Sequence, residues 1–217
     1  MDFVEIKKAI KEWSKVRTSP KKVLDNFKQG CCFKIEKTQF ELWNANSPEN
    51  LHVYLGIFDD KLKFVLVDSV SDKDPAAHQD AIFVQDYLVG LTKAEEGFID
   101  MAVDGGLTIV DALKSVVQWN VFADAWVHSA ALTTDGVFKA FFIPFSDLKS
   151  QFDNSSHLES VVFFGLDNNY KTDLILFGIN ANNKSKTTMM KAAAGGTPVE
   201  NNATPVPPFG GDDFGLM

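Results

Sequence analysis

The chain has few cysteines, and their arrangement excludes several classes of protein and site. Cys31 and Cys32 are adjacent and are its only cysteines, so they cannot form the multiple disulfides that stabilise small secreted domains. No C-x-x-C spacing and no second pair accompany them, which argues against a zinc site or a redox-active dithiol. We therefore expect the two thiols to pack as ordinary small residues in a reducing compartment.

Arginine is equally scarce, since Arg17 is the only arginine among 21 basic residues. Arginine is the preferred donor for bidentate contacts to phosphate and guanine, so its scarcity argues against sequence-specific nucleic-acid binding. An AT-rich genome would produce the same bias, because lysine codons are rich in A. Residues 1–40 are nevertheless basic on balance within a chain whose net charge is −8.

Long apolar runs are missing, as are the usual catalytic motifs. No run approaches about 18 apolar residues, so no membrane span is predicted, and the N-terminus lacks the basic start and apolar core of a secretory signal. No phosphate-binding glycine loop, G-x-S-x-G elbow or H-E-x-x-H motif occurs. With 217 residues, 45% of them hydrophobic, the sequence predicts a soluble cytoplasmic globular protein with no assigned cofactor or metal.

Apolar periodicity predicts both helices and strands. Apolar residues at three- and four-residue steps indicate helices, and two-residue alternation indicates strands. Two pairs of these strands are expected to form hairpins. The helices are expected over 3–17, 20–30, from Thr92 to about 105, over 107–131 and over 146–152; the strands are expected over 31–42 with an irregularity near Thr38, over 51–67 and 161–179 as hairpins, and over 137–145. Residues 81–89 fit either a strand or a short helix.

These elements predict an α+β fold. A mainly antiparallel sheet built from the β-hairpins would pack on the central apolar helix 107–131, with an N-terminal helical pair at its side. Composition changes sharply at residue 180, after which four of the chain's eight prolines occur among Asn, Thr, Gly and Ala. We therefore expect one globular domain over 1–179 and a flexible, extended C-terminal arm over 180–217.

The arm ends in Pro-Val-Pro-Pro-Phe-Gly-Gly-Asp-Asp-Phe-Gly-Leu-Met. Apolar anchors beside two carboxylates are typical of a peptide that docks in an apolar pocket with a basic rim, or of an arm that clasps a neighbouring subunit. The expected partner-binding residues are Phe209, Asp212, Asp213, Phe214, Leu216 and Met217. The last dozen residues resemble the acidic-hydrophobic tails of single-stranded-DNA-binding proteins, which recruit partner enzymes. Those tails carry a longer acidic run and a Pro-Phe end in place of Leu-Met.

Among possible catalytic groups, Asp124 and His128 are the best candidates. At positions i and i+4 of the predicted long helix they share a face with Asn120, where the carboxylate could orient the imidazole as a general base. The alternative is that this stripe is the solvated side of the helix. His78, near Asp74 and Asp80, could bind a metal, although an aspartate-rich loop with one histidine is more often only solvated.

Three functions follow from these residues. The first is a non-catalytic interaction or assembly protein whose C-terminal arm docks on a protein partner or on another subunit of a homo-oligomer. The second is a small cytoplasmic enzyme that uses Asp124 and His128. The third is a single-stranded-DNA-binding protein with a partner-recruiting tail. Because no catalytic motif is assembled and the arm carries clear anchors, the sequence favours the first.

Overall fold

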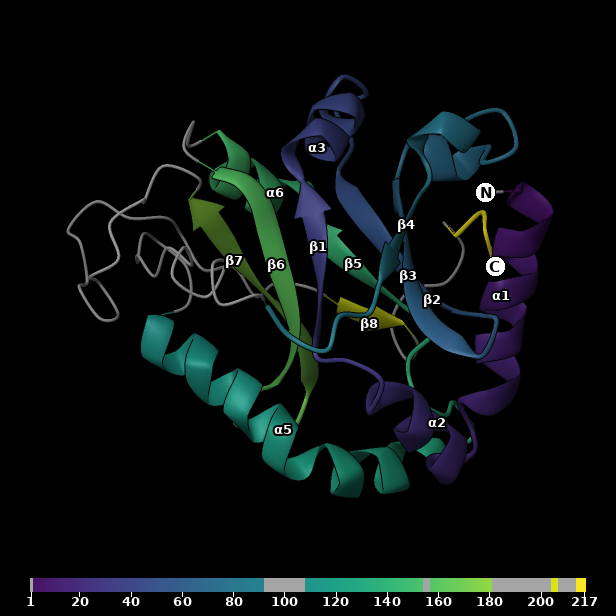
Figure 1. Cartoon of the computed structure of the whole chain (residues 1–217), viewed down its shortest axis with the longest axis vertical. Helices are drawn as coiled ribbons and strands as arrows, with labels where there is room; N and C mark the ends of the chain where they lie inside the picture. Colours follow the sequence, from purple (N-terminus) through teal and green to yellow (C-terminus); the bar gives the residue numbers. More distant parts are fainter. Residues whose placement is uncertain (1, 92–107, 154–156, 181–203, 207–213) are drawn as a thin grey trace.

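The computed structural model describes residues 2–91, 108–153, 157–180, 204–206 and 214–217, which form an α+β fold with two antiparallel sheets (Figure 1). The predicted fold class is confirmed. The first sheet has the strand order β1-β6-β7, and the second has the order β4-β3-β2-β5-β8. The strands are β1 (Cys32–Glu36), β2 (Asn50–Phe58), β3 (Lys61–Asp68), β4 (Phe83–Asp86), β5 (Ala140–Pro144), β6 (His157–Leu166), β7 (Thr172–Asn180) and β8 (Thr204–Val206).

The main core lies between the two sheets, because one face of each sheet carries a row of buried apolar side chains. Strand alternation sends Phe64 of β3 to this face, where its ring stacks on Phe33 of β1 with centroids 4.1 Å apart. Phe164 of β6 occupies the centre of the same layer and also contacts the ring of Phe64. Aromatic packing between the sheets therefore joins segments that are far apart in the sequence.

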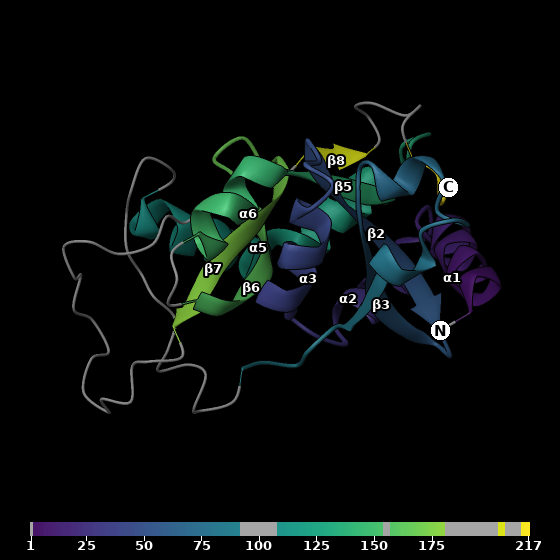
Figure 2. The same cartoon turned by 90° about the horizontal axis from the view of Figure 1, so that it is seen from above.

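Helices cover the remaining faces. Helix α1 (Phe3–Val16) packs on the outer face of the five-stranded sheet through Ile6 and Ile10, and it lies beside β2 and β3 (Figures 1 and 2). Its Trp13 indole N–H donates to the Phe138 carbonyl oxygen at 2.9 Å, which ties the helix to the segment leading into β5. The fold is completed by α2 (Pro20–Phe27), α3 (Lys37–Asn44), α5 (Ile109–Ala131), α6 (Phe145–Phe152) and the short 3₁₀ turns η1 (Ser71–Lys73) and η2 (Gln79–Ala81).

Helix α5 confirms the long helix expected over 107–131. It packs on β6, with Ala112 buried against the three-stranded sheet and Trp119 reaching the ring of Phe164 at 5.0 Å. Apolar side chains also face outward from its first half, where Val110 and Val117 are exposed. The helix that begins at Thr92 in the sequence prediction lies outside the described residues.

The continuous strand expected over 31–42 is wrong. The strand ends at Glu36, and α3 begins at Lys37. The side-chain oxygen of Gln39 accepts a hydrogen bond from the Glu36 backbone N–H at 2.9 Å, an interaction that belongs to a helix N-terminus. Phe40 and Trp43, three residues apart, then point to the same buried side, so the apolar spacing here is helical and not alternating.

Gly136 occupies a backbone position that favours glycine, and its replacement tests that conformation. It adopts φ +66°, and a Cβ there would lie 3.0 Å from the Arg17 carbonyl oxygen. We expect Gly136→Ala to lower the free energy of unfolding by about 1–2 kcal/mol, because alanine resists a left-handed conformation. Gly90→Ala is the matched control, since no atom lies within 4 Å of its added Cβ. Urea denaturation should show equal stabilities only if the turn at Gly136 is wrongly placed.

Candidate functional site

The C-terminal end of the chain lies against the folded body, beside α1 (Figures 1 and 2). Strand β8 pairs antiparallel with β5, with Thr204 opposite Phe142 and Val206 opposite Ala140. At the end of the chain, Phe214 is only 7% exposed and Leu216 only 1% exposed. The arm thus contacts the body at two places, a strand added to the five-stranded sheet and a buried C-terminal tip.

An aromatic pocket on the outer face of the five-stranded sheet holds the Phe214 ring. The ring stacks on Phe142 with centroids 4.5 Å apart, and it lies 4.7 Å from the His52 ring and 5.2 Å from the Tyr54 ring. His52 and Tyr54 share a face because they are two residues apart on β2, and Phe142 is paired with His52 across the sheet. We call His52, Tyr54, Asp72 and Phe142 the C-terminal docking site.

The docking site has a polar base formed by Asp72 of η1. Its Oδ2 accepts a hydrogen bond from the Tyr54 hydroxyl and lies 2.6 Å from Nδ1 of His52. All three side chains are buried, and Asp72 Oδ1 has no hydrogen-bond partner among the described residues. Burial, and then the charge of Asp72, raise the pKa of Tyr54 far above its ordinary value. Tyr54 therefore stays a neutral phenol and donates to the carboxylate.

The tip contacts this base through its backbone. A Cβ on Gly215 would overlap the Asp72 carbonyl oxygen and would lie 3.0 Å from Pro75, so only glycine allows this close approach. A backbone hydrogen bond from Leu216 reaches the Tyr54 hydroxyl and partly opposes the rise in its pKa. Phe214, Gly215 and Leu216 therefore each meet a distinct feature of the docking site.

The tip residues singled out in the sequence fall into three groups in the structure. Phe214 and Leu216 point inward, Met217 is exposed, and Phe209, Asp212 and Asp213 lie outside the described residues. None of the residues that receive the tip was identified from the sequence. The alternation of β2 places His52 and Tyr54 on one face, but no local pattern shows that Asp72 lies beneath them.

Asp124 and His128, the catalytic candidates, lie exposed on α5. The Asp124 carboxylate is 3.7 Å from the Lys28 ammonium group, and both side chains are about two-thirds exposed. Such an exposed ion pair contributes little to stability. Asn120, on the same stripe, is also exposed. The enzyme hypothesis and the DNA-binding hypothesis both remain predictions.

His78, Asp74 and Asp80, the possible metal ligands, are all exposed in the segment around η1 and η2. Within the described residues, no group of three or more His, Cys, Asp or Glu side chains is arranged to hold a metal ion. None of the helices in the same part of the chain is long and apolar enough to cross a membrane.

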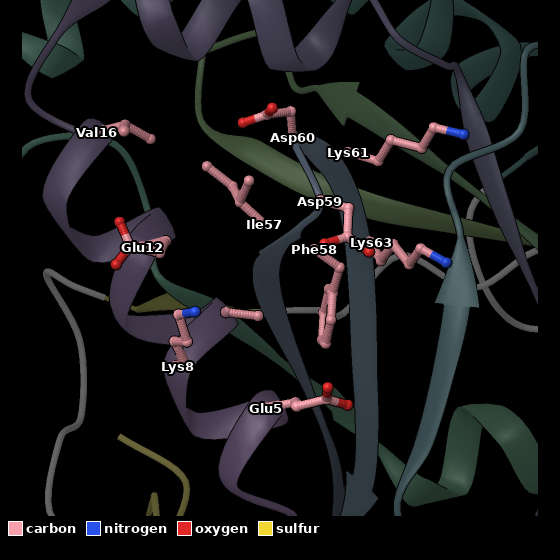
Figure 3. Close-up of a pocket in the computed structure, with 11 residues that line it drawn as sticks. Glu5, Lys8, Glu12, Val16, Ile57, Phe58, Asp59, Asp60, Lys61 and Lys63 are labelled. Atoms are coloured by element: carbon pink, nitrogen blue, oxygen red, sulfur yellow. The ribbon is translucent and has the colours of Figure 1, made fainter. Parts of the chain in front are cut away.

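A second hollow of about 690 Å³ lies between α1 and the turn that joins β2 to β3 (Figure 3). Glu5, Lys8 and Glu12 line one side from α1, and the turn residues Asp59 and Asp60 lie across from them. The charges on its rim are mixed, and some are already paired: Glu12 with Lys15 at 2.6 Å, and Lys63 with Asp86 at 2.7 Å. This hollow therefore selects no charge class of ligand.

The half-buried Cys31 thiol has a lowered pKa. A hydrogen bond from the Cys32 thiol lowers the pKa of Cys31 to about 7, although burial opposes the change. Since the thiolate is the nucleophile, we expect alkylation of Cys31 by iodoacetamide to rise with pH around a midpoint near 7. Cys32→Ala should move this midpoint upward, toward that of the urea-unfolded chain. Mass spectrometry across a pH series measures both, and identical midpoints for folded and unfolded chains would contradict the assignment.

No protein family, no characterised protein and no solved structure matches this chain.

Proposed function

We propose that this is a non-catalytic assembly protein in which the C-terminal arm of one subunit docks on the body of a neighbouring subunit. The observation that supports the proposal is the burial of Phe214 and Leu216 in a pocket built by β2, β5 and η1. The body thus carries a receptor that fits the arm. When identical chains meet, an arm can fill the neighbour's receptor with the same contacts that it makes in its own.

Two kinds of contact support docking between subunits. Addition of a strand such as β8 to a sheet edge supplies backbone hydrogen bonds, and without it β5 would be an edge strand. An aromatic anchor such as Phe214 supplies apolar burial against the ring of Phe142. Together they form a peptide-recognition mode that operates equally within one chain or between two.

The arm is also long enough for exchange. The 23 residues between Asn180 and Thr204 would span up to about 80 Å if fully extended. This exceeds the diameter of a domain of about 180 residues, for which the radius of gyration is near 16 Å. A neighbouring body is therefore within reach of the arm.

Oligomeric mass tests the proposal. We expect the full-length chain, of 24.0 kDa, to show twice that mass by light scattering on a sizing column as its concentration is raised. Phe214→Ala should lower the dimer fraction at least about 10-fold, because it removes the anchor from the pocket. Met217→Ala is the matched control, since Met217 is exposed at the same tip.

Arm exchange has a further signature. Mixed subunits that carry an engineered cysteine, either on the tip at Met217 or on the body at exposed Lys73, should form cross-links between differently labelled chains. A chain that is monomeric at every concentration, or that cross-links only within itself, would overturn the proposal.

A further inference from the structure

We infer that the C-terminal docking site is a sequence-selective receptor for a Phe-Gly-aliphatic peptide segment, and that the chain's own tip acts as its internal competitor. The occupant to which we commit is the Phe214–Met217 segment of a second copy. This inference rests on the docking site of the proposed function, and it adds the sequence that the site selects and the competition that controls access.

The first position requires an aromatic ring. Phe214 is surrounded by three aromatic side chains whose ring centroids lie within 5.2 Å of its own, and it is almost fully buried among them. Offset-stacked and edge-to-face contacts of this kind add to the free energy of burying the ring. A smaller side chain would leave the pocket partly empty.

The second position requires glycine. The backbone of Gly215 lies so close to the Asp72 carbonyl oxygen that a Cβ would overlap it. The obstructing atom belongs to the backbone of η1, and the η1 segment is held by the buried carboxylate of Asp72 through His52 and Tyr54. It cannot move aside as the end of a flexible side chain could, so any other residue at this position is disfavoured.

The third position requires an aliphatic side chain. Leu216 is 1% exposed and belongs to the apolar cluster that also contains Ile6, Ile10 and Val67. Met217 is 44% exposed, so the site places little demand on the fourth position.

Tethering makes the chain's own tip a strong competitor. A linked ligand meets its site at an effective concentration in the millimolar range, so a free segment must compete with it. A second copy is taken up only when the internal tip is displaced or altered. The site is therefore most accessible in chains whose own tip does not fit.

The test uses a fluorescent peptide of residues 212–217 with a free carboxylate, titrated with full-length chains. Gly215→Ala prevents the chain's own tip from fitting, and Phe214→Ala vacates the pocket by a different route. We expect the peptide to bind both variants saturably, and to bind the wild-type chain at least about 10-fold more weakly because the internal tip competes. The same peptide with Gly→Ala should bind the variants at least about 10-fold more weakly than the natural sequence.

The inference is overturned if the natural peptide and the peptide with Gly215→Ala bind the variants equally. It is also overturned if neither full-length variant binds the peptide although both variants unfold at the same temperature as the wild-type chain. If the peptide binds wild-type and variant chains equally, the chain's own tip does not compete for the site, and the inference is overturned. If the peptide binds as expected but the wild-type chain stays monomeric at every concentration, the receptor stands and arm exchange fails. If the chain is dimeric and the peptide does not bind, assembly stands and the inference fails.

Discussion

Replacing Phe164 with alanine is expected to lower the free energy of unfolding by about 3–5 kcal/mol, the range for a large aromatic residue removed from a packed core. Its ring contacts six other rings, which come from the facing five-stranded sheet, from α2 and α5 and from the segments beside β4 and β5: Phe27, Phe64, Tyr87, Trp119, Phe138 and Phe141. No relaxation of one element can fill the space that remains, because each neighbour is held by a different part of the chain.

Phe163→Ala is the matched control for this prediction. Phe163 is the preceding residue on β6 and has the same chemistry, but it points to the opposite face and is only partly buried. We expect its replacement to cost less than half as much. Guanidinium denaturation followed by circular dichroism measures both free energies. Equal losses would contradict the placement of the core between the two sheets.

Asp72→Ala is expected to destabilise the chain by about 3 kcal/mol and to release the C-terminal tip. The carboxylate is the shared partner of the Tyr54 hydroxyl and of Nδ1 of His52, and its loss leaves both polar groups buried without that partner. Each unsatisfied buried group costs about 1–3 kcal/mol. The η1 backbone that faces Gly215 also loses its connection to β2, so the tip should dissociate more readily.

Two variants make this prediction specific. Asp74→Ala removes an exposed carboxylate two residues further along. It should change the free energy of unfolding by no more than about 0.5 kcal/mol and should not release the C-terminal tip. Tyr54→Phe removes one hydroxyl and should cost about 1 kcal/mol. Denaturation gives the stabilities, and protease cleavage near residue 214 reports release of the tip. If Asp72→Ala behaves as Asp74→Ala does, the buried polar base contributes nothing to docking.

The two places where the arm contacts the body should depend on its sequence to different degrees. At the tip, Phe214 lies among aromatic rings and Gly215 lies too close to the Asp72 carbonyl oxygen for a Cβ, so single substitutions there should have large effects on docking. Strand β8 adds backbone hydrogen bonds to β5, which depend much less on side-chain identity. We therefore expect the specificity of docking to be concentrated in Phe214, Gly215 and Leu216.

Much of the local structure could be predicted from the sequence. Two-residue alternation identified both hairpins, and three- and four-residue spacing identified α1 and α5, because the side of an element that is buried follows from its own backbone geometry. The helix α3 was missed, although the pairing of Glu36 with Gln39 is a local signal for a helix start. The composition change at residue 180 and the apolar anchors at the tip were also legible in the sequence.

The residues that surround Phe214 and Leu216 were decided only by the tertiary structure. His52 and Tyr54 come from β2, Asp72 comes from a turn about 20 residues later, and Phe142 comes from a strand about 90 residues later. No local period links these positions, because the pairing of β2 with β5 and the packing of η1 beside β3 depend on the summed burial of the whole core. The sequence alone determined that the chain ends in apolar residues beside two carboxylates; the fold determined which residues surround Phe214 and Leu216, since long-range packing brings those residues together.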